Sequence, residues 1–352
     1  MMLSRFLYIL SVYFSLLACS SEQPEIQTVC TRDDIGNYIV KWEVTPALEG
    51  VVKMYVSDDP DEFDFTQPVG TYPISDGVAT YITHDNFNRK FFCLTFNDEY
   101  PQVVASRFVA MDEMQNFRDL GGYQTEEHRR VRWGKVFRSG TITPYTEWDS
   151  IRFSIVRVKT IIDLRPEEDA RQTPISYKKA QLVSIPISLG NQSELDRRIE
   201  HNRMRKGDGL LYMQDLYLQF VSDDTAKFAE ALDVFTHEEN YPIVFCSLLG
   251  KDQAGFLAAL LLSALDVPRE TVLRDYVASN QYIDPLHFQE RVEHLSPDTQ
   301  EAVTVLVSAR ESFLELAFRK IEKDYGSVDK YLRNELGLTD AKKNELRRLL
   351  LY

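Results

Sequence analysis

The 352-residue chain has few of the residues that build metal centres, with four cysteines and six scattered histidines. No group of them has the spacing of metal ligands, so we expect neither a metal nor a cofactor. Positive charge is also scarce, because 40 Lys and Arg against 54 Asp and Glu leave a net charge of −14. Such a surface repels the phosphates of nucleic acids and acidic lipids, which argues against a general nucleic-acid partner.

Long hydrophobic runs are few, and one of them lies near the start of the chain. Arg5 precedes an apolar run of about a dozen residues, Phe6 to Leu17. This length suits the core of a signal peptide and is short for a helix that spans a membrane. The sequence also has no internal repeats and no low-complexity segment.

The apolar run ends in LLAC, residues 16–19, which resembles the lipobox of bacterial lipoproteins. In a lipobox the signal is cleaved before the cysteine, and that thiol is then lipidated. We therefore expect residues 1–18 to be a signal peptide, Cys19 to be lipidated and residues 19–25 to be a tether. This predicts a protein of the bacterial cell envelope, at the outer membrane or cell surface, held to the membrane through its lipid only. An ordinary secretory signal is the alternative, and it also exports the chain.

Export affects the interpretation of two further cysteines. Cys30 and Cys93 both fall in strand-like segments, and an oxidising compartment permits a disulfide between them. Two separate buried thiols fit the same segments equally well.

Residues 26–110 have the pattern of a small all-β domain. Short β-type runs alternate with turn signals rich in Asp, Asn and Gly; the runs are Tyr38–Val44, Val51–Ser57, Gly77–Thr83 and Lys90–Phe96. Strands at this spacing predict a β-sandwich of the immunoglobulin or fibronectin type. No chemistry is visible in it, so we expect a spacer or a binding module.

Residues 111–352 predict an α/β domain with a central sheet flanked by helices. Val158–Leu164 and Pro242–Cys246 are nearly all apolar, as buried central strands are. Helical patterns surround them at Leu211–Phe220, Thr225–Thr236, Gly255–Ala264, Arg269–Tyr276, Pro297–Tyr325 and Ala341–Leu351. The polar stretch Leu189–Gly209 fits either a lid over a site or a surface insertion.

A strand, a short loop and a helix follow one another at Tyr241–Phe256. The apolar run Ile243–Phe245 leads into Gly250-Lys251-Asp252, and an apolar helix follows. Backbone N–H groups at the start of a helix point at one spot, where the helix dipole also favours an anion. This arrangement predicts a phosphate cradle.

Five separated motifs resemble a family of bacterial tyrosine phosphatases. They are NFRDLGGY (116–123), WGKVFRSG (133–140), IIDLRPEED (161–169), DYVASNQYI (275–283) and YGSVDKYLRNELGLT (325–339), in the family's order. The family contains secreted and lipoprotein enzymes of dual-specificity-like type. They act on phosphotyrosine and sometimes on phosphoserine, phosphothreonine or phosphoinositides. The resemblance implies a phosphorylated protein, peptide or lipid as partner.

The family's phosphate loop reads His-Cys-x-Ala-Gly-Lys-Asp-Arg-Thr-Gly, and the shared Gly-Lys-Asp aligns it here without gaps. Ser247 then takes the position of the nucleophile, Asp252 that of the general acid and Gln253 that of the essential arginine. The remaining loop positions, which the resemblance assigns to phosphate binding, are Cys246, Leu248, Leu249, Gly250, Lys251, Ala254 and Gly255.

The altered positions remove the chemistry that the family uses. A cysteine at a helix N-terminus reaches a pKa far below its free value of about 8.5, whereas a serine hydroxyl needs a neighbouring base. No histidine lies in the loop, since Cys246 stands at that position. Gln253 has no charge and cannot replace the planar fork of an arginine, a loss of on the order of a hundred-fold in rate. We therefore expect ordinary turnover to be lost.

Cys246 is the remaining candidate nucleophile, one position early. Strand side chains alternate between faces, so a shift of one residue turns this thiol away from the cradle and predicts a core thiol. A reshaped loop would be needed to bring it back. Five further residues fall in the family's motifs, where they could line the site or form ion pairs around the sheet: Arg118, Asp119, Arg138, Asp163 and Arg165.

Three functions follow from these patterns. The first is an exported pseudophosphatase that binds a phosphorylated or anionic ligand. The second is an active, diverged phosphoester hydrolase that uses Asp252, Lys251 and Cys246. The third is a surface-binding protein that acts through its β-sandwich, with the phosphatase-like domain as scaffold.

Overall fold

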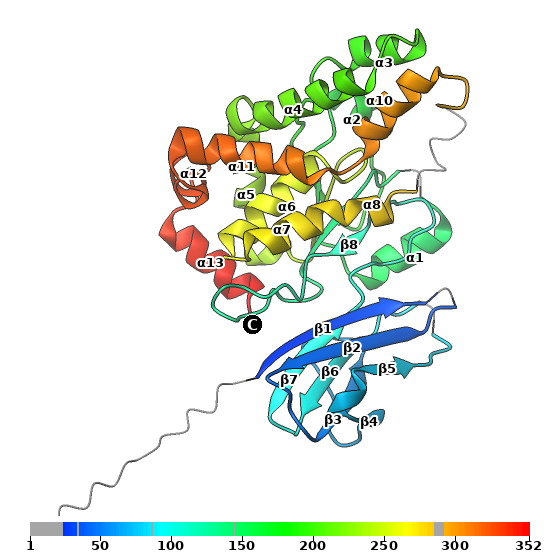
Figure 1. Cartoon of the computed structure of the whole chain (residues 1–352), viewed down its shortest axis with the longest axis vertical. Coiled ribbons are helices and arrows are strands. Elements are labelled where there is room, and N and C mark those ends of the chain that lie inside the picture. The colour runs from blue at the N-terminus through cyan, green and yellow to red at the C-terminus, as the bar shows by residue number, and fades with distance from the viewer. Residues whose placement is uncertain (1–23, 34, 86, 144, 285–291) are drawn as a thin grey trace, which may run out of the picture.

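The computed structural model describes residues 24–352 except 34, 86, 144 and 285–291 (Figure 1). The predicted signal peptide, Cys19 and most of the predicted tether lie outside the described residues. Glu25, the last residue of that tether, already belongs to the first strand.

Residues 25–105 form two antiparallel sheets, which we call the N-terminal sheets. The first has the order β1-β2-β5 and the second has the order β4-β3-β6-β7. The strands are β1 (Glu25–Arg32), β2 (Tyr38–Thr45), β3 (Val51–Ser57), β4 (Gly70–Pro73), β5 (Val78–Tyr81), β6 (Phe91–Phe96) and β7 (Tyr100–Ala105), with a 3₁₀ turn η1 at Ile74–Asp76. A strand lies within each of the four segments where the sequence predicts one.

One hydrophobic core joins the two N-terminal sheets. Tyr38 and Trp42 of β2 pack with Phe92 and Phe96 of β6, and the Tyr38 and Phe92 rings meet edge to face at 5.2 Å. Alternation along the strands produces this core, because every second residue of β2 is buried while its neighbours are exposed or partly exposed. Large aromatic side chains contribute most of the buried apolar area in such a core.

Cys30 and Cys93 are two separate buried thiols. Of the two alternatives left open by the sequence, the structure therefore shows the one without a disulfide. Burial raises the pKa of Cys30 to about 12 and the pKa of Cys93 to about 11, so both stay protonated at neutral pH.

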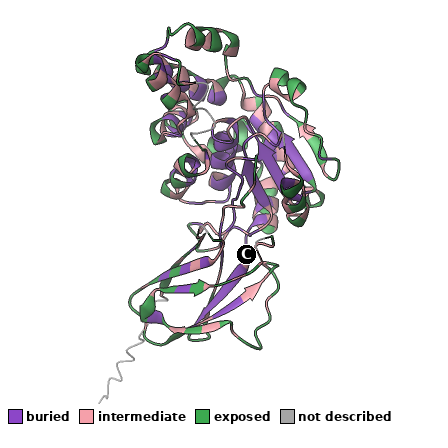
Figure 2. Cartoon of the chain, turned by 90° about the vertical axis from the view of Figure 1, so that its right-hand side faces the viewer, coloured by how far each residue is buried: buried purple, intermediate pink, exposed green. Residues whose placement is uncertain are grey.

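The rest of the chain is a mixed α/β fold built on a five-stranded sheet of order β11-β10-β12-β9-β8. Its strands are β8 (Arg118–Asp119), β9 (Val136–Ser139), β10 (Thr160–Asp163), β11 (Gln181–Ser184) and β12 (Ile243–Cys246). Strands β9 to β12 pair in parallel, and β8 is antiparallel to β9. β9, β10 and β12 are buried along their length, as the apolar runs predict for β10 and β12. Figure 2 shows buried strands within this sheet.

Helices cover both faces of this sheet (Figure 1). Their bounds are α1 (Glu147–Ile155), α2 (Glu167–Gln172), α3 (Gln192–Glu200), α4 (Lys206–Ser222), α5 (Thr225–Val234), η2 (Glu238–Asn240), α6 (Gln253–Ala264), α7 (Arg269–Val277), α8 (Ser279–Tyr282), α10 (Pro297–Val307), α11 (Glu311–Tyr325), α12 (Val328–Asn334) and α13 (Asp340–Leu350). Phe153 of α1 packs on the face that carries Val244, whereas α4, α6, α7 and α11 pack on the face that carries Phe245. Within the described ranges, no helix is both long enough and apolar enough to cross a bilayer.

The structure corrects the prediction at Pro297–Tyr325, where one helical pattern is interrupted. The segment forms α10 and α11, with Ser308 in an extended conformation between them. Asn280 stabilises the break between the two helices. Its side chain accepts a hydrogen bond from Ala309 N at 2.7 Å and donates one to Ala309 O at 2.8 Å. In Leu189–Gly209, the structure places the helix α3, whose N-cap Asn191 accepts from Glu194 N.

Candidate phosphate-binding loop

The predicted cradle is a loop between the end of β12 and the start of α6. β12 ends at Cys246, residues 247–252 form the loop, and α6 begins at Gln253. Helix α6 is buried on nearly every side, which matches its almost uniformly apolar sequence. The N-terminus of α6 is therefore held in place beneath the loop.

Three consecutive carbonyl groups of the loop are tied to the surrounding scaffold. Thr141 donates to Leu248 O from its N–H and its hydroxyl, both at 3.1 Å. Asn116 donates to Leu249 O at 2.9 Å, and Arg138 donates to Gly250 O at 2.6 Å. In a trans peptide the N–H points opposite to the preceding carbonyl, so these contacts turn the N–H groups of Leu249, Gly250 and Lys251 toward the concave side.

The loop amides have no acceptor inside the described protein. Between Leu248 and Gly255, no backbone N–H donates to any of the described residues. Buried N–H groups in folded proteins are nearly always paired, and the first N–H groups of a helix are satisfied by caps, water or ligands. The loop thus presents a run of donors to whatever occupies the cradle.

Gly250 is required by the shape of the loop. Its φ is +68°, and a Cβ at this position would lie 2.5 Å from the carbonyl carbon and oxygen of Ser139. Backbone atoms cannot yield at that distance, so a larger residue would displace the loop from β9.

A buried ion cluster supports the loop from below. Asp275 of α7 accepts from Arg138 Nη1 at 2.6 Å and from Arg118 Nε at 3.3 Å. Arg118 also donates to the Asp275 carbonyl and to the side chains of Ser279 and Asn116. Arg138 connects this cluster directly to Gly250, so the position of the loop depends on a carboxylate 25 residues beyond it in the sequence.

The pKa values show that this cluster is ionised. Burial alone would raise the pKa of Asp275, but Arg118 and Arg138 outweigh it and lower the pKa to about 2. Burial and the neighbouring Arg118 lower the pKa of Arg138 to about 10, which still leaves it charged at neutral pH. The cluster therefore holds two cations against one anion, directly behind the cradle.

Cys246 lies on the far side of the sheet from the cradle. It packs with Val244 and Phe137, and its Sγ is 3.7 Å from Asp163 Oδ1. Asp163 in turn forms a two-point ion pair with Arg165, at 2.9 and 2.7 Å. Burial first, and the Asp163 carboxylate second, raise the pKa of the Cys246 thiol well above its ordinary value. A protonated thiol in the core is not a nucleophile.

The positions that the family resemblance assigns to catalysis hold Ser247, Asp252 and Gln253. Ser247 is 1% exposed, and its hydroxyl has no basic partner among the described residues. Gln253 points its amide at the carbonyl of Ile187, at 3.3 Å. Lys251 is fully buried and pairs with Asp252 at 2.7 Å, and Tyr217 donates to the same Asp252 oxygen at 3.1 Å. Asp252 is thus held by two donors at the start of α6.

The structure brings most of the predicted site residues together, and one lies elsewhere. The loop from Cys246 to Gly255, Arg118 and Arg138 form one connected cluster, and Asp163 with Arg165 joins it through Cys246. Asp119 instead pairs with Arg89 of the N-terminal sheets at 2.6 Å. No group of three potential ligands in the described part of the chain could hold a metal ion.

Sequence reasoning missed several supporting residues, among them Asn116, Asp275 and Tyr217. Asn116 and Asp275 open two of the family-like motifs, but nothing in their local sequence reveals that they meet at the loop. Tyr217 lies 35 residues before Asp252, and only the packing of α4 on α6 brings the two together. The only sequence signal that could have found Asn116 and Asp275 was their place in the family-like motifs, and Tyr217 had no such signal.

Comparison with known proteins identifies the class. The model of the Tyrosine phosphatase family matches residues 109–352, so the chain belongs to that family.

Two curated relatives each match about two-thirds of the chain. One is a putative tyrosine-protein phosphatase of Cupriavidus necator, 29% identical over 69% of this chain and 92% of its own length. The other is the triple specificity protein phosphatase PtpB of Mycobacterium tuberculosis, 30% identical over 67% of this chain and 96% of its own. A structure of Pseudomonas aeruginosa TpbA in complex with phosphotyrosine covers 54% of this chain and 88% of its own, at 14% identity and a TM-score of 0.25. That likeness is too distant to support an argument.

Proposed function

We propose that this member of the tyrosine phosphatase family is a pseudophosphatase, which binds a phosphorylated protein, peptide or lipid in the loop from Ser247 to Gly255 without hydrolysing it. The observation that carries the proposal is the contrast within the loop. The carbonyls of Leu248, Leu249 and Gly250 are anchored, and the N–H groups from Leu248 to Gly255 have no partners among the described residues. The positions that the family resemblance assigns to the nucleophile and the arginine hold Ser247 and Gln253.

Binding is supported by the charge around the cradle. The N–H groups at the start of α6 carry the positive end of the helix dipole. Arg118 and Arg138 add two buried guanidinium groups behind the loop, of which Asp275 neutralises one charge. This electrostatic arrangement favours an anion even without a side chain that grips its oxygens.

Turnover is disfavoured because the nucleophile and the transition-state clamp are both absent. Among the described residues Ser247 has no base, and Cys246 faces Asp163 on the other side of the sheet. The second candidate, a diverged hydrolase that uses Cys246, would need this thiol to leave the core and cross the sheet.

Restoring the family residues tests the proposal directly. The wild-type protein should show no hydrolysis of an aryl phosphate or a phosphotyrosine peptide above background. Because the frame is intact, Ser247→Cys combined with Gln253→Arg should gain activity of at least a hundred-fold over background. Adding Cys246→Ala to the double variant is the matched control and should leave that activity in place. Wild-type hydrolysis that is abolished by Ser247→Ala or Cys246→Ala would overturn the proposal.

Ligand binding needs its own measurement. Titration calorimetry with a phosphotyrosine peptide should show binding by the wild-type protein and none by the unphosphorylated peptide. Gly250→Val, which forces the loop away from Ser139, should abolish it, and circular dichroism would verify that the variant is folded. Equal affinity for both peptides would contradict a phosphate-binding cradle.

We also propose that the chain is exported and lipid-anchored at the cell envelope, and that its N-terminal sheets are an immunoglobulin- or fibronectin-like sandwich. The sequence at residues 16–19 supports the first, and the shared core of two antiparallel sheets supports the second. Metabolic labelling with an alkyne fatty acid in a bacterial host should mark the wild-type chain and not Cys19→Ala. Unlabelled wild-type protein would leave the ordinary secretory signal as the better account.

A further inference from the structure

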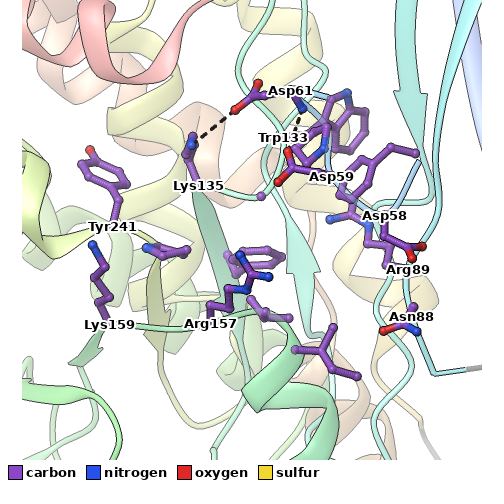
Figure 3. A pocket seen from close by; sticks show the side chains of 17 residues that line it. Asp58, Asp59, Asp61, Asn88, Arg89, Trp133, Lys135, Arg157, Lys159 and Tyr241 are labelled. Carbon is purple, nitrogen blue, oxygen red and sulfur yellow. Dashed lines mark hydrogen bonds and ion pairs between the residues drawn. The ribbon is translucent and has the colours of Figure 1, made fainter. Parts of the chain in front are cut away.

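A cavity of about 440 Å³ lies between the N-terminal sheets and the α/β part (Figure 3). We call it the junction cavity and define it by the residues that line it. These are Asp58–Asp61, Asn88, Arg89 and Phe91 on one side, and Trp133–Lys135, Phe137, Ile155–Arg157, Lys159, Tyr241 and Pro242 on the other. Its volume is in the range of small-molecule sites, which often lie between domains. It is separate from the phosphate loop, because none of the residues from Ser247 to Gly255 lines it.

The negative groups of the junction cavity are already engaged. Asp58 pairs with Lys90 at 2.6 Å, and Asp61 lies 3.6 Å from Lys135. Asp59 accepts the backbone N–H of Asp61 at 2.9 Å, which closes the turn they share. Asp58 and Asp61 are therefore paired with lysines, whereas Asp59 has no ion-pair partner among the described residues.

Two positive groups of the cavity are not engaged. Arg157 and Lys159 form no ion pair and no side-chain hydrogen bond with the described residues. Figure 3 shows their side chains rising in the same direction from one side of the cavity, with Lys135 and Tyr241 nearby. In a chain with a net charge of −14, an uncompensated pair of cations at a cavity attracts anions.

Arg157 also has an unusual backbone. It follows the C-terminus of α1 with φ = +57°, in the left-handed region. Glycine or asparagine normally occupies that position, since a side chain destabilises the conformation. Backbone preference does not explain an arginine at this position, which indicates that its side chain has a role.

The other wall offers apolar surface rather than hydrogen bonds. Trp133 already donates its indole N–H to Val103 O at 3.1 Å, and Tyr241 donates its hydroxyl to Phe235 O. Trp133, Phe91 and Phe137 also line the cavity, but they are nearly buried, whereas Ile155 is 37% exposed. The free groups of the cavity are thus two cations beside apolar surface.

From this geometry we propose that the junction cavity binds a small organic anion with an apolar body, held by Arg157 and Lys159 and packed against the apolar side chains that line the cavity, Ile155 among them. A guanidinium and an ammonium together suit a doubly charged phosphate or phosphonate group. The ligand contacts both parts of the chain, so its binding also stabilises their junction. This proposal is independent of the phosphate loop.

Trp133 provides the reporter for a test by NMR. The chain has three tryptophans, and their indole signals can be assigned by single Trp→Phe variants. Titration with phenylphosphonate should shift the Trp133 signal saturably, while the Trp42 signal in the N-terminal core stays fixed. Inorganic phosphate should bind at least tenfold more weakly, because it lacks the apolar body.

Charge variants separate this site from non-specific attraction. Arg157→Gln with Lys159→Gln should weaken phenylphosphonate binding at least tenfold. The control pair Lys178→Gln with Lys179→Gln removes the same charge from exposed positions outside the cavity and should leave binding unchanged. Gly250→Val, which disrupts the phosphate loop, should not alter the Trp133 response. Two results would overturn the proposal. One is equal phenylphosphonate affinity in the wild type and in the Arg157→Gln, Lys159→Gln variant. The other is a Trp133 shift with benzylammonium and none with phenylphosphonate.

A further variant distinguishes ligand binding from a structural role. Arg157→Gly suits the left-handed backbone, so it should raise the melting temperature while weakening phenylphosphonate binding at least fivefold. A lower melting temperature with unchanged binding would mean that Arg157 serves the fold alone.

Discussion

The two interiors of this molecule differ in what they bury. Among the described residues up to 106, the core of the N-terminal sheets is apolar apart from Thr95 and Ser106. The α/β part buries a set of charged side chains around the phosphate loop: Arg118, Arg138, Arg165, Asp163, Asp275 and Lys251. The first interior is built for stability, whereas the second holds a loop in a particular shape.

The difference matters because buried charges are an expensive way to stabilise a fold. Desolvation can exceed the attraction of a buried ion pair, and well-packed apolar residues often stabilise as much. In the α/β part the charges act on the loop, since Arg138 binds both Asp275 and the carbonyl of Gly250. A charged frame around this loop fits the proposal that the loop binds an anion.

Among these variants, removal of Asp275 should lower the free energy of unfolding most, because it leaves the buried arginines of the α/β part without their carboxylate. Asp275→Ala leaves Arg118 and Arg138 buried without their carboxylate, which should lower the free energy of unfolding by about 3–5 kcal/mol. Urea denaturation followed by circular dichroism measures this. Loss of phosphopeptide binding should accompany it. A change near zero would show that the cluster is not what holds the α/β part.

The apolar interior should respond through cavity formation instead. Leu94 is fully buried in the N-terminal core, so Leu94→Ala should cost about 2–5 kcal/mol in the same urea experiment. Val29→Ala, on an exposed position of β1, is the control and should have little effect. Unlike Asp275→Ala, the Leu94 change should leave peptide binding by the folded protein intact.

The two interiors should also differ in their dependence on pH. The pKa of Asp275 is depressed to about 2 in the folded protein and is about 3.9 when unfolded, so its contribution is present above pH 4. That contribution, about 2–3 kcal/mol, is lost as the pH falls from 4 through 2. The difference in free energy of unfolding between the wild type and Asp275→Asn should therefore become smaller as the pH falls over this range. The difference between the wild type and Leu94→Ala should stay constant. Parallel curves for both variants would contradict this assignment.

Exposed charges should matter least. Arg171 and Glu167 on α2 form a pair at 3.5 Å, and both side chains are mostly exposed. Solvent screens such pairs, so Arg171→Gln should leave the urea midpoint unchanged within error. A clear shift would mean that α2 contributes to the site in a way that its contacts do not show.

The sequence predicts much of this architecture where the pattern is local. Alternation placed the strands of the N-terminal sheets, and apolar runs placed β10 and β12. The shared Gly-Lys-Asp located the loop at the start of α6, and strand alternation indicated that Cys246 would turn away from the cradle. These features depend on neighbours in sequence.

The unpredicted features depend on distant contacts. Asp275 supports the loop through Arg118 and Arg138, which come from strands more than 130 residues earlier. The helical pattern at Pro297–Tyr325 breaks because Asn280 binds the backbone of Ala309. Asp119 belongs to a phosphatase-like motif, yet its partner Arg89 comes from the N-terminal sheets. No periodicity or spacing encodes such pairings.

The contact between Arg89 and Asp119 has a consequence for how this chain can be divided. Asp119 is fully buried, accepts the N–H groups of Gly121 and Gly134, and receives its counter-ion from across the junction. Arg89 itself lies between the rings of Phe91 and Trp133. A protein truncated to the matched region, residues 109–352, would keep the carboxylate and lose the arginine. The N-terminal sheets and the α/β part follow one another in the sequence, but they share this buried ion pair. We therefore expect either part, expressed alone, to need a substitution that replaces the missing partner.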